Sequence, residues 1–296
     1  MRLAKHLRPL IFLTPPFTLI AVFVIYPILA TFYFSFYDKN SGLLNLNNYR
    51  EVLLSTNPLN MIIARSFSYI PPWGALFHNL VWIALHVPIV TFLGLIIAYL
   101  LKYHVRGGTI IKAMLFLGIV IPPAVGGLII RFMFEANIGV IPLIFSYLGV
   151  ESLSKTWVAH PQTALLALIL GSVWLWLGFS VTIFSAAMET IPRSHIEAAR
   201  VFGASTWRIF YSVVTPQLKP AIIVVIVMTL LWDLKIFDVV YASTGGGPGG
   251  STSVLALVMY NYFARGLDYY KSAAVAIILT LLVLPLIILI IRRERV

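Results

Sequence analysis

The chain has 296 residues but contains no cysteine and few charged side chains, and both shortages restrict what it can be. Without cysteine, neither a disulfide framework nor a thiolate metal site can form. Charged residues make up 10% of the chain and hydrophobic residues 60%. Soluble domains have about 25% charged and about 45–50% apolar residues. Since so little polar surface cannot cover a protein surrounded by water, the composition indicates a chain that crosses a membrane several times.

Sequence motifs of common enzyme classes are also missing. The glycine run at 245–250 lacks the Gly-Lys-Ser/Thr ending of a phosphate-binding loop, so this chain is not expected to bind ATP. Its six histidines show no ligand spacing such as HExxH, which makes a metal site improbable. No nucleophile–base arrangement stands out. We therefore expect no cofactor in this chain, and an intramembrane enzyme is the least favoured class of function.

The formal net charge of +11 would suit a nucleic-acid-binding protein, but its distribution does not. In a membrane protein, Lys and Arg collect on the cytoplasmic side and meet anionic lipid headgroups. We therefore expect the lipid bilayer to be the partner of this charge, and no nucleic acid.

Six apolar segments have the length that membrane crossing requires, which is about 20 residues. Five are clear, at residues 11–34, 76–101, 110–134, 163–188 and 273–291. The sixth, 218–241, is less clear because its unbroken apolar run covers only 221–232. Because backbone groups in lipid must bond to one another, the spans are expected to be helices. The sequence thus predicts an all-α polytopic membrane protein with six transmembrane helices.

The basic residues decide between five and six spans. With six spans and both termini inside, the inner segments hold 13 Lys and Arg and the outer segments hold 6. With five spans, the basic tail at 292–296 would lie outside, against the positive-inside rule. The first apolar run is too long for a signal-peptide core, so we expect it to be retained as a span. The predicted location is the plasma or inner membrane, with both termini cytoplasmic.

A polar segment at 189–217 separates the fourth and fifth spans, and the six-span topology places it in the cytoplasm. Thr190 is expected to cap a helix whose first turn contains Pro192. Gly203 suits a left-handed end to that helix, and Ser205 is expected to cap a second one. The segment is thus predicted to form two short helices that meet at a glycine turn.

Small residues give this segment a smooth patch that another protein can approach closely. The patch comprises Ala198, Ala199, Gly203 and Ala204, with Glu197 beside it. An amphipathic helix resting on lipid headgroups is the alternative. Such a helix has a wide apolar face with Lys and Arg on the polar one, whereas small residues beside an acid favour a protein partner.

This segment resembles a known motif. Glu197-Ala198-Ala199, then Gly203 and Pro216, resembles the EAA loop in membrane subunits of binding-protein-dependent ABC importers. Further pieces agree in order, namely Arg106-Gly107 with Lys112, Ile121-Pro122, Asn137-Ile138-Gly139, and Phe237-Asp238 followed by the Thr-Gly-Gly-Gly-Pro sequence at 244–248. Together they resemble the MalF-type, or first, permease of carbohydrate importers over about residues 76–291. Val201-Phe202 departs from the pattern, because the family often has a polar or acidic residue there.

The resemblance implies a type I ABC importer permease fold. Residues 1–75 would form the first transmembrane helix and an outer loop. Residues 76–291 would form the core permease domain, with its coupling loop at 189–217, and residues 292–296 a cytoplasmic tail. It also implies a function: half of a sugar translocation pathway. The patch residues Glu197, Ala198, Ala199, Gly203 and Ala204 would contact a cytoplasmic ATPase.

Three kinds of protein partner follow from the same resemblance. Two ATPase subunits would bind ATP and Mg²⁺, a second permease of the MalG type would complete the pathway, and an extracytoplasmic sugar-binding protein would deliver the substrate. Gly246, Gly247 and Pro248, in an outer loop expected to be flexible, are candidates for docking that binding protein. The alternative is that the loop merely connects two spans.

The charges at the end of the predicted fifth span are candidates for the substrate pathway. Asp233, Lys235 and Asp238 lie at membrane depth, where such residues usually face a cavity or a partner. Trp232 and Asp233 together suit a sugar, since a ring face contacts the pyranose and a carboxylate binds hydroxyls. Lys235 and Asp238 can instead pair with each other at i,i+3, and a position at the outer mouth or against the second permease is the other interpretation. Trp174 and Trp176 in the fourth span are weaker candidates.

The leading function is therefore a permease subunit of an ATP-driven sugar importer, which is not itself an enzyme. The alternative is a stand-alone secondary transporter or channel for a small polar solute. No clear internal repeat occurs in the sequence, and this weakens the inverted-repeat version of that alternative.

Overall fold

The computed structural model describes residues 12–64, 70–105 and 107–293. This part of the chain consists of helices joined by turns and loops, with one isolated antiparallel bridge between Tyr37 and Leu44. Six of the basic residues used for the topology lie outside it, namely Arg2, Lys5, Arg8, Arg65, Arg106 and Arg295. Arg106 also belongs to the Arg106-Gly107 motif of the family resemblance, and of this motif the structure describes Gly107.

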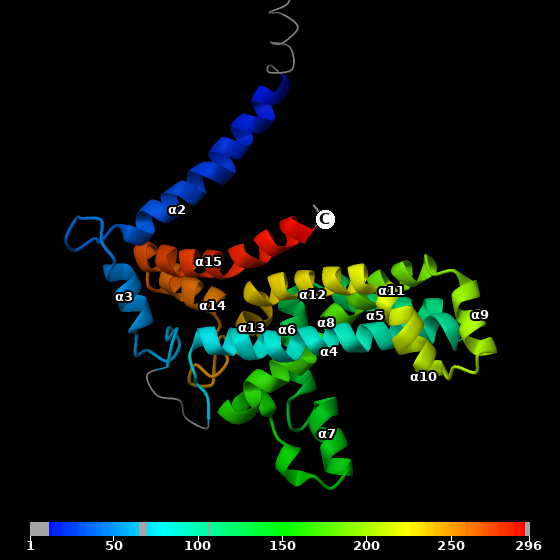
Figure 1. Ribbon diagram of the computed structural model, residues 1–296. Coiled ribbons are helices and arrows are strands. Elements are labelled where there is room, and N and C mark those ends of the chain that lie inside the picture. Colours follow the sequence, from blue (N-terminus) through cyan, green and yellow to red (C-terminus); the bar gives the residue numbers. More distant parts are fainter. Residues whose placement is uncertain (1–11, 65–69, 106, 294–296) are drawn as a thin grey trace, which may run out of the picture.

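Three described helices are long and apolar enough to cross a membrane. They are Phe12–Phe36, which contains η1 (Ala21–Ile25) and α2 (Tyr26–Phe36), then α4 (Ala75–Tyr103) and α8 (Pro161–Glu189). They confirm the first, second and fourth predicted helices. The first helix extends away from the others, whereas α4 runs along the length of the molecule (Figure 1).

The predicted helix at 110–134 is broken, which corrects the expectation of one continuous span. It consists of α5 (Gly108–Val120) and α6 (Pro123–Met133), bent by 107°. Pro122 lies between them with an extended backbone, at φ −53° and ψ 131°. Consecutive prolines lack two N–H donors, and a residue before proline avoids the helical region, so the helix ends here instead of merely kinking.

The predicted helix at 218–241 also differs from expectation. The helix α12 (Lys219–Leu234) ends at Leu234, and α13 (Asp238–Ser243) begins after a short non-helical link. On its N-terminal side, α12 is joined to the helical segment Thr206–Gln217, and the two are bent by 75°. Counting each bent pair as one span gives up to five in the described residues. The last helix, α15 (Tyr269–Arg293), has an apolar stretch at Tyr269–Pro285 that is shorter than the three long helices.

Short helices fill the connections on the predicted outer side. They are α3 (Asn47–Leu53), α7 (Val140–Tyr147), η2 (Glu151–Leu153), η3 (Trp157–Ala159), α14 (Leu255–Tyr260) and η5 (Asn261–Arg265). Helix α7 is formed by the apolar residues that follow Gly139. In Figure 1, α3 and α14 lie at one end of α4, and α7 projects from the body.

Helix α8 forms the centre of the packed body, because 72% of its most apolar 18-residue stretch is buried. In the Phe12–Phe36 helix, none of the corresponding stretch is buried. One buried cluster surrounds Trp82, Ile130 and Leu168 towards the outer half. A second surrounds Phe184, Met188 and Phe210 towards the other half. Between helices in lipid, such packing stabilises the fold through van der Waals contact, because lipid tails are as apolar as these side chains. The first helix therefore contributes little to the core of this chain.

Candidate functional site

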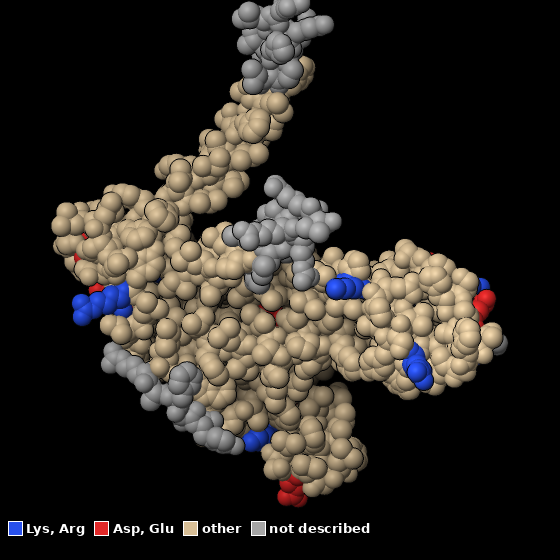
Figure 2. Space-filling model, in the orientation of Figure 1, with Lys and Arg blue, Asp and Glu red and all other residues tan. Residues whose placement is uncertain are grey.

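The loop at 189–217, which the predicted topology places in the cytoplasm, forms two short helices at one end of the molecule, as predicted. Helix α9 (Arg193–Val201) is followed by α10 (Thr206–Ile209), which continues through the π-helical turn η4 (Phe210–Val214) and α11 (Thr215–Gln217) into α12. Figure 1 shows α9 and α10 at the end opposite to α3. Figure 2 shows basic and acidic side chains at that end and few charges along the apolar body next to it.

Local sequence explains the glycine turn. Gly203 has φ +74°, so it adopts the left-handed conformation that glycine tolerates best, and its N–H donates to the carbonyl of Arg200 at 2.9 Å. The hydroxyl of Ser205 accepts from the N–H of Arg208 at 3.4 Å, which confirms the second cap. The prediction that Thr190 caps the first helix of the loop was wrong, because Thr190 ends α8 and its hydroxyl donates back to the carbonyl of Ala187.

Buried anchors hold this loop against the body. Ile196, Ile209 and Phe210 are buried beside residues of α4 and α8. The ring of Tyr99 on α4 lies 5.0 Å from that of Phe210, and its hydroxyl donates to the carbonyl of Thr206 at 3.2 Å. The loop is thus fixed to the two long helices by apolar packing and one hydrogen bond.

The opposite face of the loop is open. Glu197, Ala198 and Gly203 are exposed, and Ala199 and Ala204 are half-buried. The apolar Val201 and Phe202 are 84% and 89% exposed. Of the apolar side chains in this loop, Ile196 and Phe210 are buried against the body, whereas Phe202 is turned outward. An exposed aromatic ring beside small residues is a typical anchor for a second protein.

A half-buried aromatic group lies on α8 and α12. The rings of Trp176 and Trp232 stack at 4.0 Å and 21°, and Phe179 meets Trp232 edge-on at 4.9 Å. Trp232 and Trp176 were both predicted candidates, and the structure adds Phe179 to them. Trp174 is half-buried elsewhere, packed against the outer core cluster. The i,i+3 spacing of Trp176 and Phe179 was a sequence signal that they share a helix face.

Asp233 differs from its expected surroundings. Its carboxylate is fully buried, and its Oδ2 lies 2.9 Å from Nδ1 of His86 on α4, whereas the sequence indicated no partner. In this conformation the carboxylate faces α4 and not the half-exposed surface of Trp232. Lys235 and Asp238 are both exposed and both described, and they form no ion pair with each other.

The outer glycine-rich loop is compact, which corrects the expectation of a flexible segment. The hydroxyl groups of Thr244 and Thr252 are hydrogen-bonded at 2.7 Å, and the Thr252 hydroxyl also donates to the carbonyl of Gly247 at 2.8 Å. Residues 251–253 are fully buried. The Ser253 hydroxyl donates to the carbonyl of Leu59. Of the docking candidates, Gly246 is buried, while Gly247 and Pro248 are half-buried.

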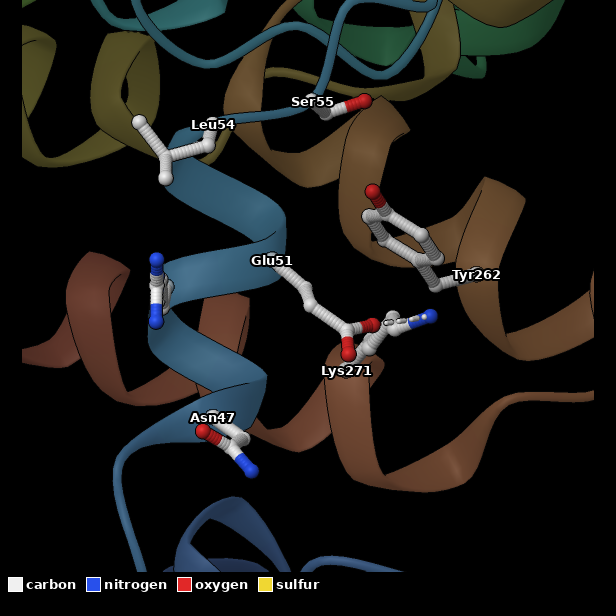
Figure 3. Close-up of a pocket in the computed structure, with 7 residues that line it drawn as sticks. Asn47, Glu51, Leu54, Ser55, Tyr262 and Lys271 are labelled. Carbon is white, nitrogen blue, oxygen red and sulfur yellow. Dashed lines mark ion pairs between the residues drawn. The ribbon is translucent and has the colours of Figure 1, made fainter. Parts of the chain in front are cut away.

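A polar cavity of about 520 Å³ lies on the same outer side, between α3, η5 and α15. Its lining comprises Asn47, Arg50, Glu51, Leu54, Ser55, Tyr262 and Lys271. Lys271 Nζ pairs with the Glu51 carboxylate at 2.7 Å and with Asp268 at 3.1 Å. Figure 3 shows Glu51 and Lys271 meeting between the two helices, with Tyr262 and Ser55 above them. The pair ties α3 to α15, and none of the lining residues was predicted to be functional.

Two further residues were missed by the sequence analysis. Asn79 and His86 lie within the apolar run of α4, seven residues apart and hence on one helix face, and both are buried. Polar residues at span depth usually have a partner. That rule was applied to the charged residues of the fifth span only, although it applies equally to these two.

Comparison with known proteins agrees over most of the chain. The family model described as binding-protein-dependent transport system inner membrane component matches residues 90–293. A probable ABC transporter permease protein of Pyrococcus horikoshii is 53% identical, over 98% of this chain and 99% of that protein. The trehalose/maltose transport system permease protein MalF of Thermococcus litoralis is 30% identical, over 91% and 88%.

A solved structure has the same fold. It is the crystal structure of a bacterial ABC transporter involved in the import of the acidic polysaccharide alginate, in which one chain matches with a TM-score of 0.79 and 17% identity. The match covers 100% of this chain and 99% of the other. The overall fold of this chain is therefore that of the matching chain.

Proposed function

Because the chain belongs to the family of inner membrane components of binding-protein-dependent transport systems, we propose that it is a permease subunit of an ATP-driven sugar importer. The observation that carries this proposal is the α9–α10 loop, whose exposed Glu197, Ala198 and Phe202 are held out on buried anchors. Relatives along nearly the whole chain transport sugars by name, among them trehalose/maltose and alpha-glucoside permeases.

In this proposal the chain has six spans. The bent α5–α6 pair counts as the third, α12 as the fifth and α15 as the sixth. Both termini are cytoplasmic, since the basic residues then concentrate on the inner side. Residues 1–75 form the first span and outer loop, 76–291 the core and 292–296 the tail. A second permease of the MalG type would supply the other half of the pathway, against which the unburied first helix can pack.

The loop at 189–217 is the proposed contact with two cytoplasmic ATPase subunits, which bind ATP and Mg²⁺ in place of this chain. Glu197, Ala198, Ala199, Gly203 and Ala204 are the proposed contact residues. Because η4 and α11 link the loop directly to α12, a movement imposed on the loop is passed to the helix that carries Trp232. The loop therefore has the position that coupling ATP hydrolysis to transport requires.

The sugar pathway is proposed to pass the aromatic group of Trp176, Phe179 and Trp232. Aromatic faces suit the apolar side of a pyranose, and exposed Lys235 and Asp238 continue along the chain towards the outer side. Trp174 and Asp233 are also retained as pathway candidates, although neither is exposed beside Trp232 in this conformation. An extracytoplasmic sugar-binding protein would dock near Gly246, Gly247 and Pro248.

The proposal is tested on the complete importer. This chain is tagged, co-expressed with its neighbouring permease and ATPase and reconstituted with its binding protein, and ATPase stimulation is measured over a sugar panel that includes trehalose and maltose. We expect at least one sugar to stimulate hydrolysis severalfold and to accumulate inside vesicles only with ATP. Transport by the isolated chain without ATP would instead establish the stand-alone transporter.

A further inference from the structure

Helices α4 and α12 bring buried polar side chains together beneath the outer glycine-rich loop. His86 contributes Nδ1 and Asp233 contributes Oδ2, 2.9 Å apart, and both side chains are fully buried. Asn79, on the same face of α4, is 1% exposed. We call His86, Asp233 and Asn79 the polar bridge.

Asn79 joins three segments of the fold at one point. Its Nδ2 donates to the backbone carbonyl of Asp233 at 3.1 Å, near the end of α12. Its Oδ1 accepts from the N–H of Leu255 at 2.9 Å, at the start of α14. The preceding residue, His78, places its Nδ1 2.7 Å from the carbonyl of Ser253. The end of α12 and the outer loop are therefore both tied to α4.

The bridge is not explained by stability alone. Asp233 Oδ1 and His86 Nε2 are buried without a hydrogen-bond partner among the described residues, and so are Thr229 Oγ1 and Trp82 Nε1 one turn away on the same two helices. Buried polar groups that are only partly satisfied are costly, and an apolar pair of similar size is often as stable or more stable. A hydrogen-bonded polar pair instead has a fixed geometry. It therefore allows only one rotation of α12 against α4.

That rotation determines where Trp232 points. Successive side chains on a helix are separated by about 100°. With Asp233 directed at His86, Trp232 is turned to Trp176, on which it stacks at 4.0 Å. A rotation of α12 that broke the bridge would move Trp232 out of the stack, whereas apolar neighbours could slide past each other without a comparable loss.

We propose that His86 and Asn79 are positioning residues, which hold the outer end of α12 in the rotation that presents Trp232 to the sugar and link this rotation to the outer loop. The inference rests on the proposed function for its consequence in transport. Its structural part, the fixed orientation of residues 232–245, can be measured without any sugar.

The test compares His86→Leu, Asp233→Leu, the double variant and Asp233→Asn in the purified importer complex, with exposed His160→Leu as the control. Thermal unfolding and backbone hydrogen exchange of residues 232–245 are measured. Each single Leu variant is expected to lower Tm by about 10 °C, because it leaves one buried polar partner alone. The double variant should regain most of this Tm, yet exchange in 232–245 should remain at least about tenfold faster than in the parent.

Asp233→Asn keeps an oxygen acceptor for His86 and should retain slow exchange. A double variant with parental Tm and parental exchange would overturn the proposal, because the bridge would then be structural only. If the single variants do not fold, the double variant and Asp233→Asn still decide the question. In transport, the double variant should raise the KM for the stimulating sugar, found by the panel above, at least fivefold. The absence of any stimulating sugar would count against the proposed function and leave the exchange result unaffected.

Discussion

The two ends of the molecule, predicted to be its cytoplasmic and outer ends, use glycine and polar residues in opposite ways. At the cytoplasmic end, Gly203 turns the chain in open space, where a Cβ would meet nothing within 4 Å, and Phe202 beside it is 89% exposed. At the outer end, Gly250 also has a positive φ, but its backbone is packed on the carbonyl of Pro58, and the following residues 251–253 are fully buried.

This difference indicates which loop is packed within this chain and which loop has a face left for a partner. The outer loop hydrogen-bonds most of its polar side chains within the chain, through Thr244, Thr252, Ser253 and the histidine beneath it. The cytoplasmic loop also hydrogen-bonds polar side chains such as Ser205 and Gln217, but it leaves the aromatic side chain of Phe202 exposed. We therefore expect substitutions at the outer end to affect folding, and substitutions at the cytoplasmic end to affect association.

The largest effect is expected from Gly250→Ala. A Cβ at this position would overlap the carbonyl oxygen of Pro58, and φ +83° disfavours any side chain. Strain and overpacking together should cost about 3 kcal/mol or more. Thermal unfolding of the purified complex measures this, with Gly249→Ala as the control, since that glycine has a positive φ but open space around it. Equal loss in both variants would show that close packing is not the cause.

The next effect is on association. Phe202→Ser should leave Tm unchanged but lower ATPase retention during purification about tenfold or more, because exposed aromatic anchors often contribute 2 kcal/mol or more to binding. Tyr147→Ser is the matched control, since Tyr147 is 91% exposed on α7, away from the loop. If Phe202→Ser copurifies as much ATPase as Tyr147→Ser, Phe202 is not part of the contact.

A smaller effect is expected from Gly203→Ala. The left-handed conformation alone costs a non-glycine residue about 1–2 kcal/mol, and no contact is lost. Gly203→Asn should cost less, because Asn tolerates this conformation better than Ala. Thermal unfolding of both variants sharpens the comparison with Gly250, and a loss for Gly203→Ala as large as that for Gly250→Ala would contradict it.

The smallest effect concerns pH at the turn after α2. The Asp38 carboxylate accepts hydrogen bonds from side chains of Asn45 and Asn47, from the N–H of Asn40 and from Ser41, which hold its pKa well below the ordinary value. A lowered folded-state pKa stabilises the fold above the unfolded pKa, and the contribution is lost as pH falls through the folded value. The Tm difference between parent and Asp38→Asn should therefore be constant from pH 8 to about 5 and shrink in more acidic buffer.

The membrane class and the two short helices of the loop could be read from the sequence because they depend on composition and local chemistry. Run length identified the helices, and the turn of the loop followed from residues such as Gly203 and Ser205, whose roles are local. The breaks at Pro122 and after Leu234 were not predicted. A proline in an apolar run is compatible with both a kink and a break, and no proline marks the break after Leu234.

By itself, the sequence determined an all-helical membrane chain with a loop of two short helices, because apolar length, proline, glycine and capping residues act within a few residues of one another. Only the tertiary structure decided that Asp233 meets His86 across 147 positions of sequence separation, that Trp232 stacks on Trp176, and that the glycine-rich loop is buried against Pro58 and Leu59. Those contacts join segments distant in sequence, and their geometry depends on how the helices rotate and bend against each other.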